Sequence, residues 1–200
     1  MSPFKDQLQR LAQEPDTLLK RARFVALLSR EMERRGGSTP IIVGGEAVEL
    51  YTQGNYTSGD IDLKATQLLC IILEEHGFRH NGSGNYYHAG LDIYVDWLGP
   101  NFDIPGQEET AARAISIHLG GDDHVKVIGL EDLIVDRLNA AKHARDTDSR
   151  IWAKALWGVA RKAEITLDLA YLRRIARFED VEDELDRIIA PETGDEDLPH

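Results

Sequence analysis

The sequence predicts a mixed α/β fold, in which a small mixed β-sheet is flanked by N-terminal helices and by a C-terminal helical segment. Strand and helix patterns alternate up to Gly129, and apolar residues recur at helical spacing before and after that region. The composition, 42% hydrophobic and 29% charged over 200 residues, is ordinary for a globular protein. The expected segments are an N-terminal helical segment 1–36, an α/β core 37–130, a C-terminal helical segment 131–190 and an acidic disordered tail 191–200.

Two helices are expected before the sheet. The stretches "FKDQLQRLAQ" and "DTLLKRARFVALLSREMERRGG" both show helical spacing, and Pro15 separates them. Asp16 is the expected N-cap of the second helix. The residues 18–37 hold six basic and two acidic side chains, which makes this helix basic but not basic enough for a dedicated RNA binder.

The core begins with a short buried strand at 41–43, followed by a helix that contains Ala47 and Tyr51. A "TSG" turn then leads into a strand at 60–64. The next helix is expected to have Thr66 as its N-cap and Gly77 as its C-terminal stop.

Two strand pairs and a run of helices complete the expected elements. A hairpin joins a strand at 85–88 to the longer strand "LDIYVDWL", and "ISIHL" pairs with "HVKVI" across "GGDD". After Gly129 the pattern is helical. It begins with "LEDLIVDRLNAAKHAR", continues from Asp148 to about Lys162 and then through "LDLAYLRRIARF", and ends with an acidic helix.

Charge and cysteine content set the expected compartment and partners. The lone Cys70 lies in the apolar run "LLCIILEE", which predicts a buried thiol and a cytoplasmic protein. We expect neither a secretory signal nor a membrane span. The net charge is −12, and the residues 179–200 hold ten acids against Arg187 alone. We therefore expect a solvated acidic end, and no nonspecific DNA binding.

The motif Asp60-Ile61-Asp62 is the first candidate for chemistry. Side chains two apart on a strand point to the same face, with Cα atoms roughly 6.6 Å apart. The two carboxylates therefore repel each other unless a cation lies between them. Mg²⁺ prefers such oxygen ligands and keeps positions for water and phosphate. Two metal ions would need a third carboxylate. In "LDIYVDWL", Asp92 and Asp96 lie four residues apart and are expected to share a face of one strand.

The pair Gly44-Gly45 is the second candidate. It is expected to end a strand and open a helix, where bare backbone N–H groups approach a phosphate with the helix dipole behind them. A glycine pair after a strand is usually only a turn, and a lone Asp-x-Asp is often a surface pair. The glycine pair followed by the Asp-x-Asp motif, as in "VGGEAVELYTQGNYTSGDIDL", is a more specific signal for a functional site than either motif alone.

This stretch resembles the signature of the polymerase-β-type nucleotidyltransferase superfamily, and more narrowly its small prokaryotic members, several of which occur as toxin or antitoxin partners. The similarity spans roughly 41–157, is strongest at 43–63, and includes "VKVIGLEDLIVDRLNAAKHARDTD". The resemblance implies a Mg²⁺ or Mn²⁺ site and an NTP substrate such as ATP. The implied acceptor hydroxyl belongs to a protein, an RNA or a small molecule.

The resemblance also assigns residues. Gly44 and Gly45 would contact the triphosphate, and Asp60 and Asp62 would bind metal. Asp96 is the expected third carboxylate and Asp92 its alternative, while Ser58 either caps the turn or lies beside the phosphates.

This chain departs from the superfamily at two points. Relatives often have serine where Gly45 stands, and many place an arginine shortly before the Asp-x-Asp motif. Two alternatives therefore stay open. One is an inactive interaction module, such as an antitoxin-like partner, and the other is a metal-dependent phosphoesterase.

Overall fold

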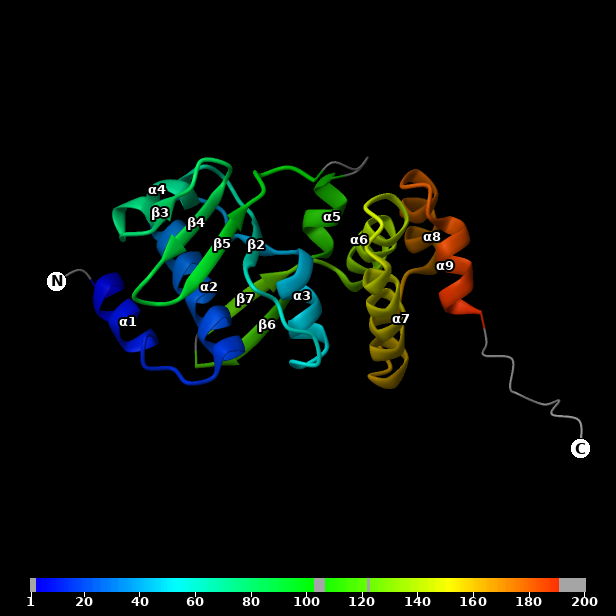
Figure 1. Cartoon of the computed structure of the whole chain (residues 1–200), viewed down its shortest axis with the longest axis horizontal. Helices are drawn as coiled ribbons and strands as arrows, with labels where there is room; N and C mark the ends of the chain where they lie inside the picture. Colours follow the sequence, from blue (N-terminus) through cyan, green and yellow to red (C-terminus); the bar gives the residue numbers. More distant parts are fainter. Residues whose placement is uncertain (1–2, 103–106, 122, 191–200) are drawn as a thin grey trace, which may run out of the picture. The chain divides into compact units, whose positions relative to one another are not determined.

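The computed structural model describes residues 3–102, 107–121 and 123–190. The chain divides into two units, Met1–Gly129 and Leu130–His200, and Figure 1 labels their helices and strands. The predicted acidic tail 191–200 lies outside the described residues. Among the residues that are described, no helix combines the length and the apolar character needed to cross a membrane.

The first unit contains a seven-stranded mixed sheet in the order β3-β4-β5-β2-β1-β7-β6. The mixed α/β class predicted from the sequence is therefore confirmed. In chain order its described elements are α1 (Pro3–Leu11), α2 (Thr17–Arg34), β1 (Ile41–Ile42), α3 (Gly44–Tyr51), β2 (Ile61–Lys64), α4 (Leu68–Glu75), β3 (Arg79–His80), β4 (Asn85–His88), β5 (Ile93–Trp97), α5 (Gln107–Arg113), β6 (Ile115–Gly120) and β7 (Asp123–Val127).

The sheet combines antiparallel hairpins with parallel central pairs. The two predicted hairpins are confirmed, because β4 pairs antiparallel with β5 and β6 pairs antiparallel with β7. The strands β2 and β5 run parallel, as do β1 and β7, whereas β1 and β2 are antiparallel. The strands that carry the candidate carboxylates, β2 and β5, are therefore direct neighbours.

Local signals in the sequence account for the start of α2 and the end of α4. The Asp16 carboxylate accepts the N–H of Leu19 at 2.9 Å, which confirms it as the N-cap of α2. Gly77 follows α4 with a φ of +90°, as a helix stop does. The expected Thr66 cap is wrong, because Gln67 occupies the cap position of α4 and makes no side-chain cap bond.

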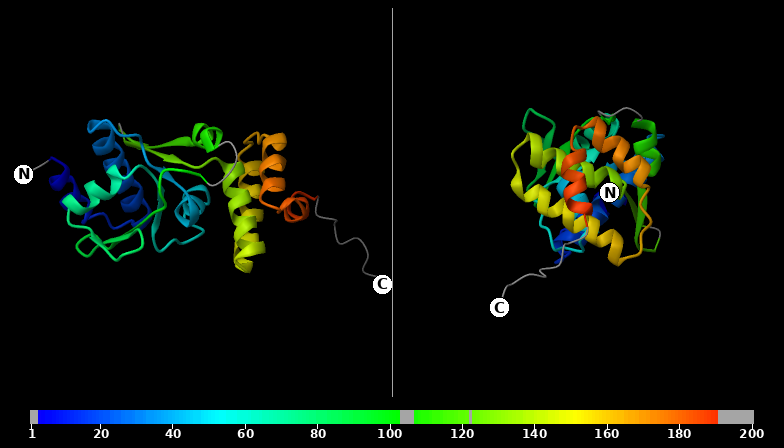
Figure 2. Two further views of the ribbon diagram at one scale, coloured as in Figure 1. Left: turned by 90° about the horizontal axis from the view of Figure 1, so that it is seen from above. Right: turned by 90° about the vertical axis from the view of Figure 1, so that its right-hand side faces the viewer.

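The core of the first unit lies between helices and one face of the sheet. Figures 1 and 2 place α2 and α4 on one side of β4 and β5. Large side chains less than 2% exposed fill this space, among them Phe24, Leu28, Met32, Ile42, Ile61, Leu63, Leu69, Ile72, Leu73 and Ile93. Cys70 is also buried, as predicted.

The second unit is helical in its described part. It consists of α6 (Leu130–His143), α7 (Thr147–Lys162), α8 (Leu169–Phe178) and α9 (Glu182–Ile189). The Asp168 carboxylate caps α8 by accepting the N–H of Tyr171 at 3.0 Å. The Tyr171 hydroxyl donates to the buried Asp132 of α6 at 2.5 Å, so α8 is joined to α6 by a buried polar bond as well as by apolar packing.

Candidate functional site

The candidate carboxylates lie on two neighbouring parallel strands. Asp62 of β2 is in register with Asp96 of β5, so their side chains leave the same face of the sheet. Asp60 immediately precedes β2, and all three residues are partly exposed, whereas the alternating Ile61 and Leu63 are fully buried. The alternation expected from the Asp-Ile-Asp motif is present.

The predicted glycine turn meets this face of the sheet. Gly44 opens α3, and the Val43 N–H donates to the Asp62 carbonyl at 3.0 Å. The Gly45 N–H donates to Asp62 Oδ2 at 3.2 Å. A backbone N–H at the first turn of α3 therefore binds an anionic oxygen, here that of the Asp62 carboxylate.

Only glycine fits at the first position of this turn. A Cβ built on Gly44 would lie 2.1 Å from Asp62 Oδ2, and the residue has a φ of +57°. That left-handed backbone is one that side-chain-bearing residues rarely adopt. The close approach of β2 to the start of α3 therefore depends on this residue.

We expect Gly44→Ala to destabilise the protein by about 1–2 kcal/mol, because of the left-handed backbone, and to displace the Asp62 carboxylate. The matched control is Gly59→Ala, since a Cβ at Gly59 meets nothing within 4 Å and its φ is not left-handed. Thermal unfolding of both variants tests the expectation. Equal stability of the two would show that the turn tolerates a side chain.

The second glycine accommodates the loop that leads to Asp60. A Cβ on Gly45 would lie 2.9 Å from Ser58 Oγ and 3.3 Å from the Tyr56 hydroxyl. The buried Ser58 hydroxyl donates to the Asp60 carbonyl at 2.8 Å. Ser58 thus stabilises the turn before β2, and the absence of a Cβ at Gly45 leaves room for the Ser58 side chain.

Asp96 has the electrostatic environment of a proton acceptor. Burial raises the pKa of its carboxyl above the ordinary value, and the charge of Asp60 adds to the effect. Asn85 opposes both by donating its side-chain N–H to Asp96 Oδ1 at 2.6 Å. A carboxylate with a raised pKa takes up a proton from a hydroxyl more readily than an exposed one.

The prediction that Asp92 and Asp96 share a strand is wrong. β5 begins at Ile93, and Asp92 lies in the preceding turn, exposed and with a φ of +52°. Aspartate is one of the few residues that adopt this left-handed conformation readily. The structure brings Asp96, and not Asp92, into register with Asp62.

A buried ion network beside the site was missed by the sequence analysis. Arg21 of α2 donates to Glu46 at 2.7 Å and to Glu49 at 2.5 Å, and the three side chains are at most 8% exposed. Glu49 also accepts the N–H of Ser58 at 2.6 Å. The network therefore fixes the loop before Asp60 to α3 and α2. Its signals in the sequence were the basic face of α2 and the glutamate that follows the glycine pair.

Glu46 is the member of this network whose buried carboxyl group is least well satisfied. Its Oε1 is buried and has no hydrogen-bond partner in the part of the chain described. Burial raises the pKa of Glu46 from 4.5 to about 7, despite the opposing charge of Arg21. The negative charges of Glu49 and Asp62 also raise the pKa of Glu46. The protonation of Glu46 therefore depends on the Asp62 carboxylate at the glycine turn.

This pKa makes stability depend on pH. Between about pH 4.5 and 7 the folded protein keeps a proton on Glu46 that the unfolded chain has lost. The free energy of unfolding therefore falls as pH rises through that window, by about 3 kcal/mol. Glu46→Gln should remove this fall, whereas Glu33→Gln on the exposed side of α2 should keep it. Urea unfolding at pH 5 and pH 8 measures both, and an unchanged slope in Glu46→Gln would contradict the assignment.

The donor set fits a hard divalent cation. Asp60, Asp62 and Asp96 offer carboxylate oxygens from one face, the ligands that Mg²⁺ and Mn²⁺ prefer. Among the described residues, no three acidic, histidine or cysteine side chains already converge at metal-binding distances. Asp62 is instead bonded to the Gly45 N–H and Asp96 to Asn85. The fit thus rests on the chemistry of the donors and on their common face.

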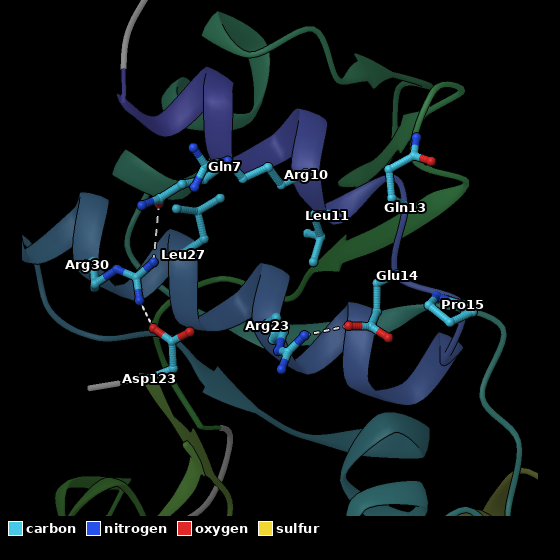
Figure 3. A pocket seen from close by; sticks show the side chains of 10 residues that line it. All are labelled: Gln7, Arg10, Leu11, Gln13, Glu14, Pro15, Arg23, Leu27, Arg30 and Asp123. Atoms are coloured by element: carbon cyan, nitrogen blue, oxygen red, sulfur yellow. Dashed lines mark hydrogen bonds and ion pairs between the residues drawn. The ribbon is translucent and has the colours of Figure 1, made fainter. Parts of the chain in front are cut away.

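A separate cavity of about 340 Å³ opens between α1, α2 and the start of β7. Figure 3 shows its side chains, with Arg23 paired to Glu14 and Arg30 paired to Asp123. Neither the glycine turn nor a candidate carboxylate lines this cavity. Because most charged groups of the cavity pair with each other, we place the candidate chemistry at Asp60, Asp62 and Asp96 instead.

Neither a scan against protein-family models nor a search of the curated proteins finds a match to this chain. The function is therefore inferred from the geometry of the site.

Proposed function

We propose that this protein is a Mg²⁺-dependent nucleotidyltransferase that moves a nucleoside monophosphate from an NTP to a hydroxyl acceptor and releases pyrophosphate. One observation carries the proposal: Asp62 faces both the glycine turn, through the Gly45 N–H, and Asp96 on the neighbouring strand. The same face thus joins the glycine turn at the start of α3 to a set of carboxylates. The resemblance of the stretch 43–63 to polymerase-β-type nucleotidyltransferases agrees with this combination.

Each residue then has a defined task. The backbone N–H groups of Gly44 and Gly45 hold the triphosphate at the start of α3, and the Gly45 N–H exchanges its bond to Asp62 Oδ2 for a phosphate oxygen. Asp60, Asp62 and Asp96 would hold Mg²⁺ or Mn²⁺, which would neutralise phosphate charge. Ser58 keeps the Asp60 backbone in place, and the Arg21 network holds Ser58.

The transfer itself is an in-line displacement at the α-phosphorus. The acceptor oxygen forms a bond to the α-phosphorus while the bond to the oxygen that bridges the α- and β-phosphates breaks, and pyrophosphate leaves. The proton of the acceptor hydroxyl passes to the Asp96 carboxylate, which lies in register with Asp62 on the neighbouring strand.

Labelling in a cell lysate tests the proposal and identifies the acceptor. The protein is incubated with each NTP labelled at the α-phosphate, with Mg²⁺ or Mn²⁺ and lysate, beside an Asp62→Asn control. A macromolecule or small molecule labelled by the wild type alone supports transfer. Intact NTP in every reaction would instead indicate an interaction module, and label released without an acceptor would indicate a phosphoesterase.

A further inference from the structure

The face of the sheet that carries Asp96 also carries a pair of stacked tyrosines. Tyr87 of β4 and Tyr94 of β5 are direct cross-strand partners, and their ring centroids are 4.3 Å apart at an interplanar angle of 25°. Tyr94 lies two residues before Asp96, so both side chains leave the same face of β5, with Cα atoms roughly 6.8 Å apart.

The opposite face of these two strands is the buried one. Tyr86 of β4 and Ile93 and Val95 of β5 are at most 4% exposed, and α2 and α4 lie on one side of the strands in both Figure 1 and Figure 2. Tyr94, in contrast, is 47% exposed. The aromatic pair therefore presents a ring to solvent directly beside the candidate carboxylates.

We propose that Tyr94, backed by Tyr87, is a stacking platform for a nucleobase of the substrate. Aromatic faces bind bases of any identity by stacking, and a neighbouring ring holds the platform at a fixed angle. The inference rests on the proposed function, which places an NTP and its acceptor at this face. The base comes either from the NTP or from the terminal nucleotide of an RNA acceptor.

A cross-strand tyrosine pair also stabilises a hairpin by itself. Such a role requires no exposed ring and gives no preference for a ligand that carries a base. Binding measurements that compare probes with and without a base therefore distinguish a base-stacking role from a role in hairpin stability.

The test uses two pairs of probes in the presence of Mg²⁺. The first pair is the non-cleavable analogue α,β-methylene-ATP and ribose 5-triphosphate, which lacks a base. The second is an eight-residue oligoadenylate RNA and the same oligomer with an abasic 3′ end. Ribose 5-triphosphate and the oligomer with the abasic 3′ end are called the base-free probes, because each lacks the base at the tested position. The variants are Tyr94→Leu, Tyr94→Phe as the conservative replacement, and Phe178→Leu as a control at an exposed aromatic residue of the second unit.

Tyr94→Leu should weaken the binding of at least one base-bearing probe by about 5- to 150-fold. The base-free partner of that probe should bind as before, and Tyr94→Phe and Phe178→Leu should keep the wild-type affinities. A loss confined to the ATP analogue assigns the platform to the NTP, and a loss confined to the RNA assigns it to the acceptor. Equal losses for base-bearing and base-free probes, or no loss at all, would overturn the platform.

A second measurement applies if Tyr94→Leu does not fold. In Tyr94→Trp, base-bearing probes should quench the indole fluorescence and base-free probes should not. The two proposals also fail separately. If the wild-type protein binds probes in a base-dependent way but transfers nothing, only the proposed function is contradicted. If it transfers a nucleotide but binds base-bearing and base-free probes equally, only the stacking platform is contradicted.

Discussion

Replacement of Asp62 by Asn is expected to lower nucleotidyl transfer by about 10²- to 10⁴-fold while the protein stays folded. Metal-assisted stabilisation of the transition state is worth several kcal/mol, and the substitution removes the charge that holds the cation. Stability should be kept or slightly raised, because the repulsion among carboxylates on one face decreases. The Asn oxygen can still accept the Gly45 N–H that Asp62 Oδ2 accepts at 3.2 Å.

Asp60→Asn and Asp96→Asn should behave in the same way, and Asp92→Asn serves as the matched control. Asp92 is exposed in a turn with a φ of +52°, a conformation that Asn adopts as readily as Asp. The experiment pairs thermal unfolding, with and without Mg²⁺–NTP, with a transfer assay for all four variants. Retained transfer together with lost stability in Asp60→Asn or Asp62→Asn would mean that these carboxylates are structural.

The second large effect is expected at Arg21. Arg21→Met should destabilise the protein by about 3–5 kcal/mol at pH 7, because it leaves Glu46 and Glu49 buried without a cation. Transfer should also fall, since Glu49 holds the Ser58 N–H and Ser58 holds the Asp60 carbonyl. At pH 5 the loss should shrink, because the buried acids then take up protons.

The control for Arg21 lies two residues further along the same helix. Arg23 pairs with Glu14 at the surface, where its side chain is 43% exposed, so Arg23→Met should cost less than about 1 kcal/mol. Urea unfolding at pH 5 and pH 7 measures both variants. Equal effects of the two substitutions would show that the buried network contributes no more than a surface ion pair.

Local chemistry in the sequence accounts for what could be predicted. The Asp16 cap, the Gly77 stop and the antiparallel hairpins each depend on neighbouring residues. The common face of Asp60 and Asp62 follows from strand alternation alone, and the buried Ile61 between them agrees with it. Such features need no knowledge of distant contacts.

The features that could not be predicted depend on tertiary structure or on backbone conformation. The Arg21 network joins residues 25 and 28 positions apart in the sequence, and a basic helix face does not reveal which cation becomes buried. The alternation of apolar and other residues in "LDIYVDWL" predicts a strand that includes Asp92, although the backbone turns before Ile93. The register that joins Asp62 to Asp96 is likewise a property of the folded sheet.

The most direct test of the central claim is to follow both ends of the triphosphate at once. The wild-type protein is incubated with Mg²⁺, acceptor and an NTP labelled in parallel reactions at the α- or the γ-phosphate. Transfer by this site predicts that the α-label appears on the acceptor and the γ-label appears in pyrophosphate, and that Asp62→Asn does neither. The γ-label in inorganic phosphate with an unlabelled acceptor, or an NTP that stays intact, would contradict the account.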